Sequence, residues 1–141
     1  RNAQYATECG GCHMAYPPGR LPARSWRELM QGLDDHFGDN AELLPATTAE
    51  LTDYLVANAA DHSGYRRARG IAASVAGGPA PLRISETPYF RRQHHEIPPR
   101  LVTANDGVRS WSNCAACHRQ AGQGVFDEDG VRIPGAGRWD D

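Results

Sequence analysis

The sequence predicts a mainly α-helical protein with long, irregular connections. Apolar residues recur at helical spacing in three segments, around residues 26–37, 51–60 and 88–97. The 15 glycines and 10 prolines among the 141 residues favour loops between such segments. With 40% hydrophobic residues, this composition indicates a loop-rich chain that wraps around a large apolar group.

Two short runs, residues 9–13 and 114–118, share the pattern Cys-x-x-Cys-His and contain all four cysteines. This pattern is the attachment signature of a c-type haem. Two thiols three positions apart on a helical turn can reach both vinyl groups of one porphyrin, and the next imidazole can face the iron. The sequence therefore predicts two covalently attached haem c groups, haem 1 and haem 2, with His13 and His118 as their proximal ligands. The thioether bonds would come from Cys9, Cys12, Cys114 and Cys117.

Other uses of paired cysteines fit less well. A thioredoxin-type redox motif needs a βαβ setting, which the sequence does not suggest. Zinc ribbons separate their cysteine pairs by roughly 15–20 residues, whereas about 100 residues separate the pairs here. Neither alternative explains why a histidine follows each pair.

Helix signals divide the first half of the chain. Residues 3–14 are expected to form a short helix that carries the first haem motif. Residues 25–28 match a capping box, which predicts a helix that starts at Trp26. Its apolar stripe continues to His36, and Gly38 stands where a helix C-cap is expected.

A second capping box, residues 47–50, predicts a helix that ends near Ala60. Residues 63–87 form a glycine- and proline-containing connector, with a short helix expected over residues 65–75. Thr87 followed by proline is typical of a helix N-terminus, with threonine as the cap.

The remaining chain contains the second haem motif on a short helix and then a tail. The tail combines apolar residues 125–126 and 131–133 around Asp129 and Gly130, which predicts a small hairpin.

The sixth iron ligands determine the chemistry, because methionine raises a haem potential and a second imidazole leaves it lower. Methionine occurs only at Met14 and Met30. Met14 directly follows His13 and cannot reach the opposite face of haem 1. The choice for haem 1 is therefore between His36 and Met30, and the position of His36 at the end of the apolar stripe favours His36.

The sixth ligand of haem 2 is expected to be a histidine, because no methionine occurs after residue 30. The candidates are His62, His94 and His95. His94 shares a helix face with Phe90 and Ile97, which favours it, although the adjacent His95 remains an alternative.

Charge and hydropathy exclude several classes of function. The net charge of −2 gives no reason to expect binding to nucleic acid or to an anionic membrane. Residues 1–63 carry 4 Arg against 9 Asp and Glu, a net charge of −5, and residues 64–141 carry 11 Arg against 8, a net charge of +3. No run of about 18 apolar residues occurs, so we expect no membrane span.

The order of elements in residues 3–60 resembles a compact class I cytochrome c, with a haem motif on the first helix and an amphipathic helix at the end. This resemblance implies a class I-like haem domain in residues 1–62. A loop-rich C-terminal haem domain would then occupy residues 63–141.

A second resemblance covers nearly the whole chain. It involves residues 36–38, 58–61, 87–90, 94–97 and 113–118, which are similar to those of the dihaem cytochrome c family of purple phototrophic and related bacteria. The family resemblance implies two low-spin, low-potential haems with bis-histidine ligation. Carried onto this sequence, the ligand pairs are His13 with His36 and His118 with His94.

The resemblance implies a soluble electron carrier that works by outer-sphere transfer. Expected partners are a small high-spin cytochrome that accepts electrons and an upstream membrane or quinol-linked donor. Because haem is attached to c-type proteins outside the bacterial cytoplasm, we expect a monomeric periplasmic protein whose export signal has been removed. The alternatives are a small peroxidase-like or gas-binding dihaem enzyme with one open iron, and a haem subunit of a larger oxidoreductase.

Overall fold

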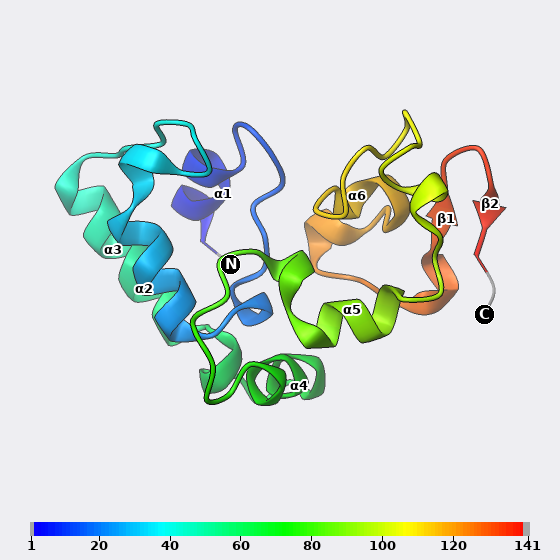
Figure 1. The fold of residues 1–141 in the computed structure, drawn as a ribbon. Coiled ribbons are helices and arrows are strands. Elements are labelled where there is room, and N and C mark those ends of the chain that lie inside the picture. Colours follow the sequence, from blue (N-terminus) through cyan, green and yellow to red (C-terminus); the bar gives the residue numbers. More distant parts are fainter. Residues whose placement is uncertain (1, 140–141) are drawn as a thin grey trace.

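The computed structural model describes residues 2–139, and it is mainly helical (Figure 1). The described residues contain six α-helices and one two-stranded antiparallel hairpin. The elements are α1 (Ala3–Cys9), α2 (Ala23–Gln31), α3 (Pro45–Ala57), α4 (Arg66–Ser74), α5 (Pro88–His94), α6 (Cys114–Cys117), β1 (Arg132–Ile133) and β2 (Gly137–Arg138). The predicted mainly α-helical class is thus confirmed.

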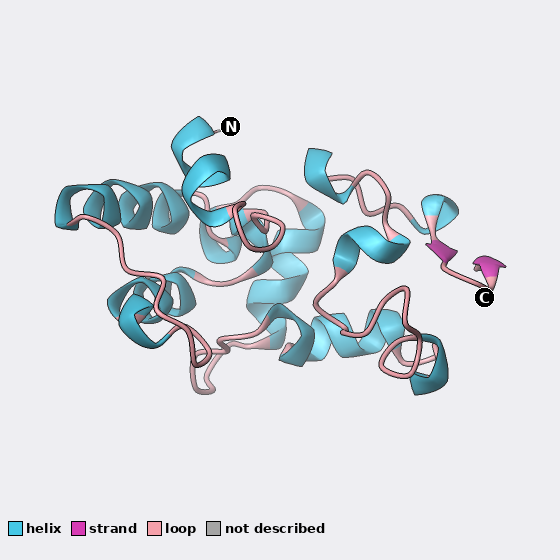
Figure 2. Cartoon of the chain, turned by 90° about the horizontal axis from the view of Figure 1, so that it is seen from above, coloured by secondary structure: helices cyan, strands magenta, loops and turns pink. Residues whose placement is uncertain are grey.

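The helices gather in two groups. Figure 1 shows α1, α2 and α3 on one side, α6 and the hairpin on the other, and α4 and α5 between them. Loops and short 3-10 turns make up much of the rest, as Figure 2 shows from above. Within residues 2–139, no helix has the length and apolarity that crossing a membrane would require.

The core of the first group lies between α2 and α3. Leu51 and Leu55 of α3 are completely or almost completely buried, and Trp26 of α2 donates a hydrogen bond from its indole Nε1 to the Pro18 carbonyl at 2.8 Å. The buried members of this cluster are Tyr5, Leu21, Ala23, Trp26, Met30, Leu51, Leu55 and Ala59. This packing fixes α1, and with it the first haem motif, against the helix pair.

The first helix is shorter than predicted, since α1 ends at Cys9 and does not continue to Met14. The reason is the glycine pair that follows Cys9. The N–H of Gly10 still bonds to the Ala6 carbonyl, but a Cβ at position 10 would clash with that same oxygen. Only glycine fits this close approach.

The predicted start of α2 is also wrong, because the helix begins at Ala23 and its first turn is capped from a distant part of the chain. The Ala23 N–H donates to Oδ1 of Asp61 at 2.9 Å. Ser25, which the capping box assigned to the N-cap, is buried inside the first turn instead. A carboxylate at a helix N-terminus satisfies a free N–H and complements the helix dipole.

The segment after α2 leaves helical geometry earlier than predicted. The helix ends at Gln31, a 3-10 turn covers Leu33–Asp35, and His36 follows in a tight loop. His36 and Asp39 exchange two backbone hydrogen bonds, of 2.7 and 3.1 Å. Phe37 lies between them with φ of 54°, a left-handed conformation that is uncommon for a bulky side chain.

The later elements follow the predictions in part. α3 begins at Pro45, with proline in the first turn, and not at the predicted capping box over residues 47–50. α4 lies within the range expected for it, and α5 begins as predicted: Thr87 Oγ1 accepts from the Phe90 N–H at 3.2 Å. The hairpin turns at residues 134–136 and not at Asp129–Gly130, which belong to a 3-10 turn.

The two predicted haem domains are in direct contact. The loop between α1 and α2 reaches the C-terminal half, where the Tyr16 hydroxyl donates to the Ser112 carbonyl at 2.8 Å. The guanidinium carbon of Arg20 lies 4.2 Å from the centre of the Phe126 ring. This loop of the first half therefore forms part of the surroundings of the second haem motif.

Candidate haem sites

The first site is formed by the end of α1 and the loop that follows α2. Cys9 ends α1, and Cys12 and His13 follow in the glycine-containing turn. Nδ1 of His13 lies 2.8 Å from the Met14 carbonyl oxygen. Since a carbonyl can only accept, Nδ1 carries the proton, and Nε2 is left as the nitrogen available to a metal.

The structure brings His36 to the same site. Its ring stacks over that of His13 with the centroids 6.3 Å apart and an angle of 25° between the planes. The tight loop that ends α2 early is what turns His36 towards His13. Met30, the alternative candidate, is buried in the core between α2 and α3.

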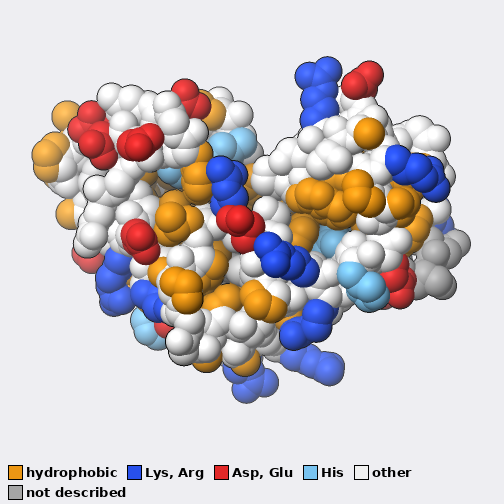
Figure 3. Space-filling model, viewed as in Figure 1, with side chains coloured by type: hydrophobic (Ala, Val, Ile, Leu, Met, Phe, Trp, Pro, Cys, Tyr) orange, Lys and Arg blue, Asp and Glu red, His pale blue; other side chains and the backbone are white. Residues whose placement is uncertain are grey.

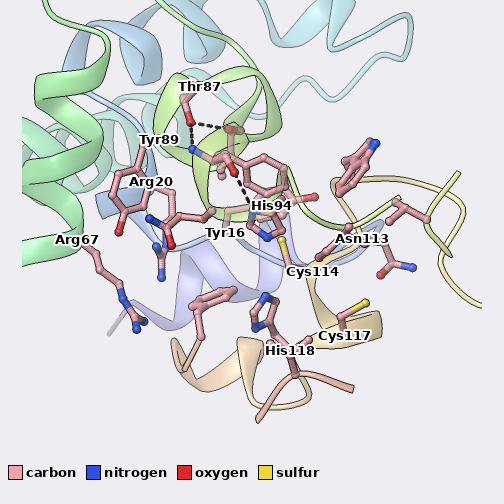
Figure 4. A pocket seen from close by; sticks show the side chains of 18 of the residues that line it. Tyr16, Arg20, Arg67, Thr87, Tyr89, His94, Asn113, Cys114, Cys117 and His118 are labelled. Carbon is pink, nitrogen blue, oxygen red and sulfur yellow. Dashed lines mark hydrogen bonds between the residues drawn. The ribbon is translucent and has the colours of Figure 1, made fainter. Parts of the chain in front are cut away.

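The second site is formed by α5 and α6. His118 follows directly after α6, and His94 is the last residue of α5. Their ring centroids are also 6.3 Å apart, with an angle of 75° between the planes. Nδ1 of His94 donates to the Phe90 carbonyl at 2.8 Å. The Phe90 ring stacks on the His94 imidazole, with their centroids 3.8 Å apart. These contacts fix the orientation of the imidazole and leave Nε2 directed away from α5 (Figure 4).

The spacing of both pairs fits a single metal ion between two imidazoles. A metal–imidazole bond of about 2.0–2.1 Å, with about 1.1 Å from the nitrogen to the ring centre on each side, gives a centroid separation of about 6.3 Å. Both observed separations have this value. Each pair contains the histidine of one Cys-x-x-Cys-His run, so the residues present fit two haem irons.

A large cleft surrounds the second pair. The space between its walls is about 1340 Å³, a figure that includes space open to solvent. Its walls are mainly apolar and aromatic, and they come from both halves of the chain. Residues of the wall include Tyr16, Phe90, Ile97, Val108, Trp111 and Phe126. A cleft with this apolar and aromatic lining around an imidazole pair is suited to a porphyrin.

Burial shifts the protonation of the site residues. It is the main reason why the pKa values of His36, His94 and His118 are lowered, followed for His36 and His118 by the partner histidine of each pair. Neutral imidazole is the form that binds metals, so the protein favours the ligand state. Burial likewise raises the pKa of the Cys114 and Cys117 thiols.

The other candidate ligands lie elsewhere. His95 is exposed, with Nδ1 2.8 Å from the Arg92 carbonyl and Nε2 3.9 Å from a carboxylate oxygen of Glu96. His62 is exposed as well, and its Nδ1 lies 2.6 Å from the Val56 carbonyl. Neither ring is in contact with the rings of the two pairs.

Three further residues belong to the second site, although no sequence pattern marks them as site residues. Tyr16 and Arg20 belong to the first half, about 100 residues before the motif that they approach, and Phe126 lies in the tail. The Phe126 ring centroid is 5.3 Å from that of His118. No local pattern marks these residues. The packing of the loop after His13 brings Tyr16 and Arg20 to the cleft, and the packing of the tail brings Phe126.

Comparisons with known proteins agree with this arrangement. Residues 5–126 match the family model of dihaem cytochrome c. A diheme cytochrome c of Shewanella baltica OS155 is similar in structure, with a TM-score of 0.82 and 46% identity over 99% of this chain and 98% of that one. A diheme cytochrome c from Rhodobacter sphaeroides has a TM-score of 0.78 and 48% identity over 89% and 96%. The comparison with curated proteins gives no significant match.

These matches cover most of the chain at high identity, and the family match includes both Cys-x-x-Cys-His runs. Two c-type haems are therefore the cofactors of this protein, and its function is that of a haem-based electron-transfer protein. The chain belongs to the dihaem cytochrome c family.

Proposed function

We propose that this protein is a periplasmic electron carrier whose two haems are both bis-histidine ligated, by His13 with His36 and by His118 with His94. The observation that carries the proposal is the centroid separation of 6.3 Å in both imidazole pairs. Haem iron supplies one-electron chemistry, cycling between the ferrous and ferric states.

The role of the chain is to hold the imidazoles in place. Hydrogen bonds from Nδ1 of His13 to the Met14 carbonyl and from Nδ1 of His94 to the Phe90 carbonyl fix the tautomer and the ring orientation. Two imidazoles on each iron would leave no coordination position for a substrate. The chain therefore supports outer-sphere electron transfer and not a reaction on a bound molecule, and two imidazoles favour a low potential.

The partners that we propose are redox proteins, met in small and transient contacts. The electron acceptor is a small high-spin haem protein, and the donor is a membrane or quinol-linked enzyme. The uneven charge supports separate contacts for the two, since acidic side chains gather on the side of α1–α3 and arginines on the other side and the lower edge (Figure 3). The carrier acts as a monomer.

The decisive experiment is to record the Soret spectrum of the reduced protein with and without carbon monoxide. We expect no change, because both irons would have six protein and porphyrin ligands. A shift of the Soret band of either haem would instead support the alternative, a peroxidase-like or gas-binding enzyme with one open iron. A reductive titration should consume two electrons per chain, one for each haem.

A further inference from the structure

Two arginines lie in the cleft of haem 2, on the side away from an attachment cysteine. Arg20 and Arg67 both line the cleft. In Figure 4 they lie at one end of it and Cys117 lies at the other, with the rings of His94 and His118 between. Cys114, the second attachment cysteine, lies nearer the middle in the same view and close enough to Arg20 for their charges to interact. Only Cys117 is thus at the end of the cleft opposite the arginines.

Arg20 is the less solvated of the two arginines. Its guanidinium group is half-buried and lies over the Phe126 ring, with the guanidinium carbon 4.2 Å from the ring centre. Burial, and after it the neighbouring charge of Arg67, lowers the pKa of Arg20. Among residues 2–139, no carboxylate lies within ion-pair distance of Arg20, whereas Arg67 pairs with Asp127 at 3.3 Å.

A guanidinium in a mostly apolar cleft, beside a second cation, is unfavourable unless an anion accompanies it. Haem provides such an anion in a defined place. Its two propionates leave the porphyrin from the edge opposite the vinyl groups, and the cysteines hold the vinyl edge. With Cys117 marking the vinyl edge, the propionates of haem 2 would face the end of the cleft where Arg20 and Arg67 lie.

We infer that Arg20 binds a propionate carboxylate of haem 2, with Arg67 beside it as a second, more exposed cation. Guanidinium and carboxylate groups form short, charge-assisted hydrogen bonds, often two in parallel. The inference requires haem 2 in this cleft, but it does not depend on which histidine is the sixth ligand. It can therefore fail while the bis-histidine proposal stands, and the reverse also holds.

The assignment has a consequence for the potentials. Arg20 belongs to the loop between the haem 1 motif and α2, so a charge from the first half of the chain acts on the haem of the second half. A cation beside a propionate offsets the negative charge that stabilises ferric iron. Arg20 should therefore raise the potential of haem 2 and leave that of haem 1 almost unchanged.

The test compares Arg20→Gln and Arg20→Lys with the wild-type holoprotein. Arg100→Gln is the control, since Arg100 is exposed and does not line the cleft. Potentiometric titration gives both midpoint potentials, and resonance Raman spectra report the propionate bending bands. For Arg20→Gln we expect a lower potential for one haem only, a shift of one set of propionate bands, and a pH dependence of that potential that begins at a higher pH. Arg100→Gln should match the wild type.

Arg20→Lys keeps the positive charge but loses the planar guanidinium that can form two parallel hydrogen bonds. The potential of haem 2 in this variant should therefore lie between its values in the wild type and in Arg20→Gln. Unchanged potentials and propionate bands in Arg20→Gln would overturn the inference, as would an equal shift of both haems. If Arg20→Gln does not yield holoprotein, Arg20→Lys decides: normal haem content with a shifted propionate band supports the charge pairing. Equal loss of holoprotein in both variants would point to packing on Phe126 and overturn it.

Discussion

The imidazole planes of His94 and His118 are nearly perpendicular, at 75°, although their centroids have the same 6.3 Å separation as those of His13 and His36. In the pair at haem 1 the planes are nearly parallel, at 25°. Two axial imidazoles interact with the iron d orbitals, and the angle between the ring planes determines the energy separation of these orbitals. The two haems should therefore differ electronically even with identical ligands.

This difference predicts the low-temperature EPR spectrum of the oxidised protein. We expect two low-spin ferric signals of equal spin count: an ordinary rhombic signal from haem 1 and a signal with one large, low-field g value from haem 2. A high-spin signal would show that an iron lacks its sixth ligand. Two identical rhombic signals would contradict the ring angle of the second pair.

The choice between His94 and His95 can be tested by substitution. His94→Ala should open the iron of haem 2, so that carbon monoxide shifts the Soret band of half of the reduced haem. His95→Ala should leave the spectrum insensitive to carbon monoxide, because His95 is exposed and its ring lies away from His118. In His94→Gly, added free imidazole should close the site again. Carbon monoxide binding by the His95 variant alone would reverse the assignment.

The hydrogen bond between Asp61 and the first residue of α2 predicts that loss of the Asp61 carboxylate lowers stability. Asp61→Ala removes the acceptor of the Ala23 N–H and should lower the free energy of unfolding by about 0.5–2 kcal/mol, the usual cost of losing an N-cap. Urea titration of the holoprotein followed by far-UV circular dichroism measures the difference. Asp53→Ala is the matched control, because Asp53 is an exposed aspartate on α3. An equal effect of the two substitutions would show that the hydrogen bond of Asp61 contributes nothing.

The differences between sequence prediction and structure have a common physical origin. Local patterns were sufficient for α4, α5 and the two cysteine runs, because capping, periodicity and motif spacing involve neighbouring residues. The start of α2 depends instead on Asp61, some 38 positions after Ala23, and a local capping box could not show that. His36 was identified as a candidate from the wrong geometry: it lies in a loop after α2 and not on the helix stripe. Arg20 was missed altogether, since its position in the second cleft follows from tertiary packing alone.

Tyr5 predicts how stability depends on alkaline pH. Its side chain is 7% exposed, and its hydroxyl donates to the Tyr16 carbonyl at 2.5 Å. Burial raises the pKa of this phenol well above its usual value. An unfolded chain loses the proton near pH 10 while the folded chain keeps it, so the stabilising effect of Tyr5 is complete below about pH 10 and declines above it.

Tyr5→Phe should therefore have opposite effects in two pH ranges. At neutral pH the variant loses a buried hydrogen bond and should be less stable by about 0.5–1.5 kcal/mol. Above about pH 10 the stability of the variant should fall less steeply than that of the wild type, because the variant has one ionisable group fewer that loses its proton on unfolding. Urea midpoints across this range measure both effects. Tyr65→Phe, at a side chain that is 82% exposed, should show neither; an unchanged alkaline slope in the Tyr5 variant would mean that Tyr5 ionises equally in the folded and unfolded chain.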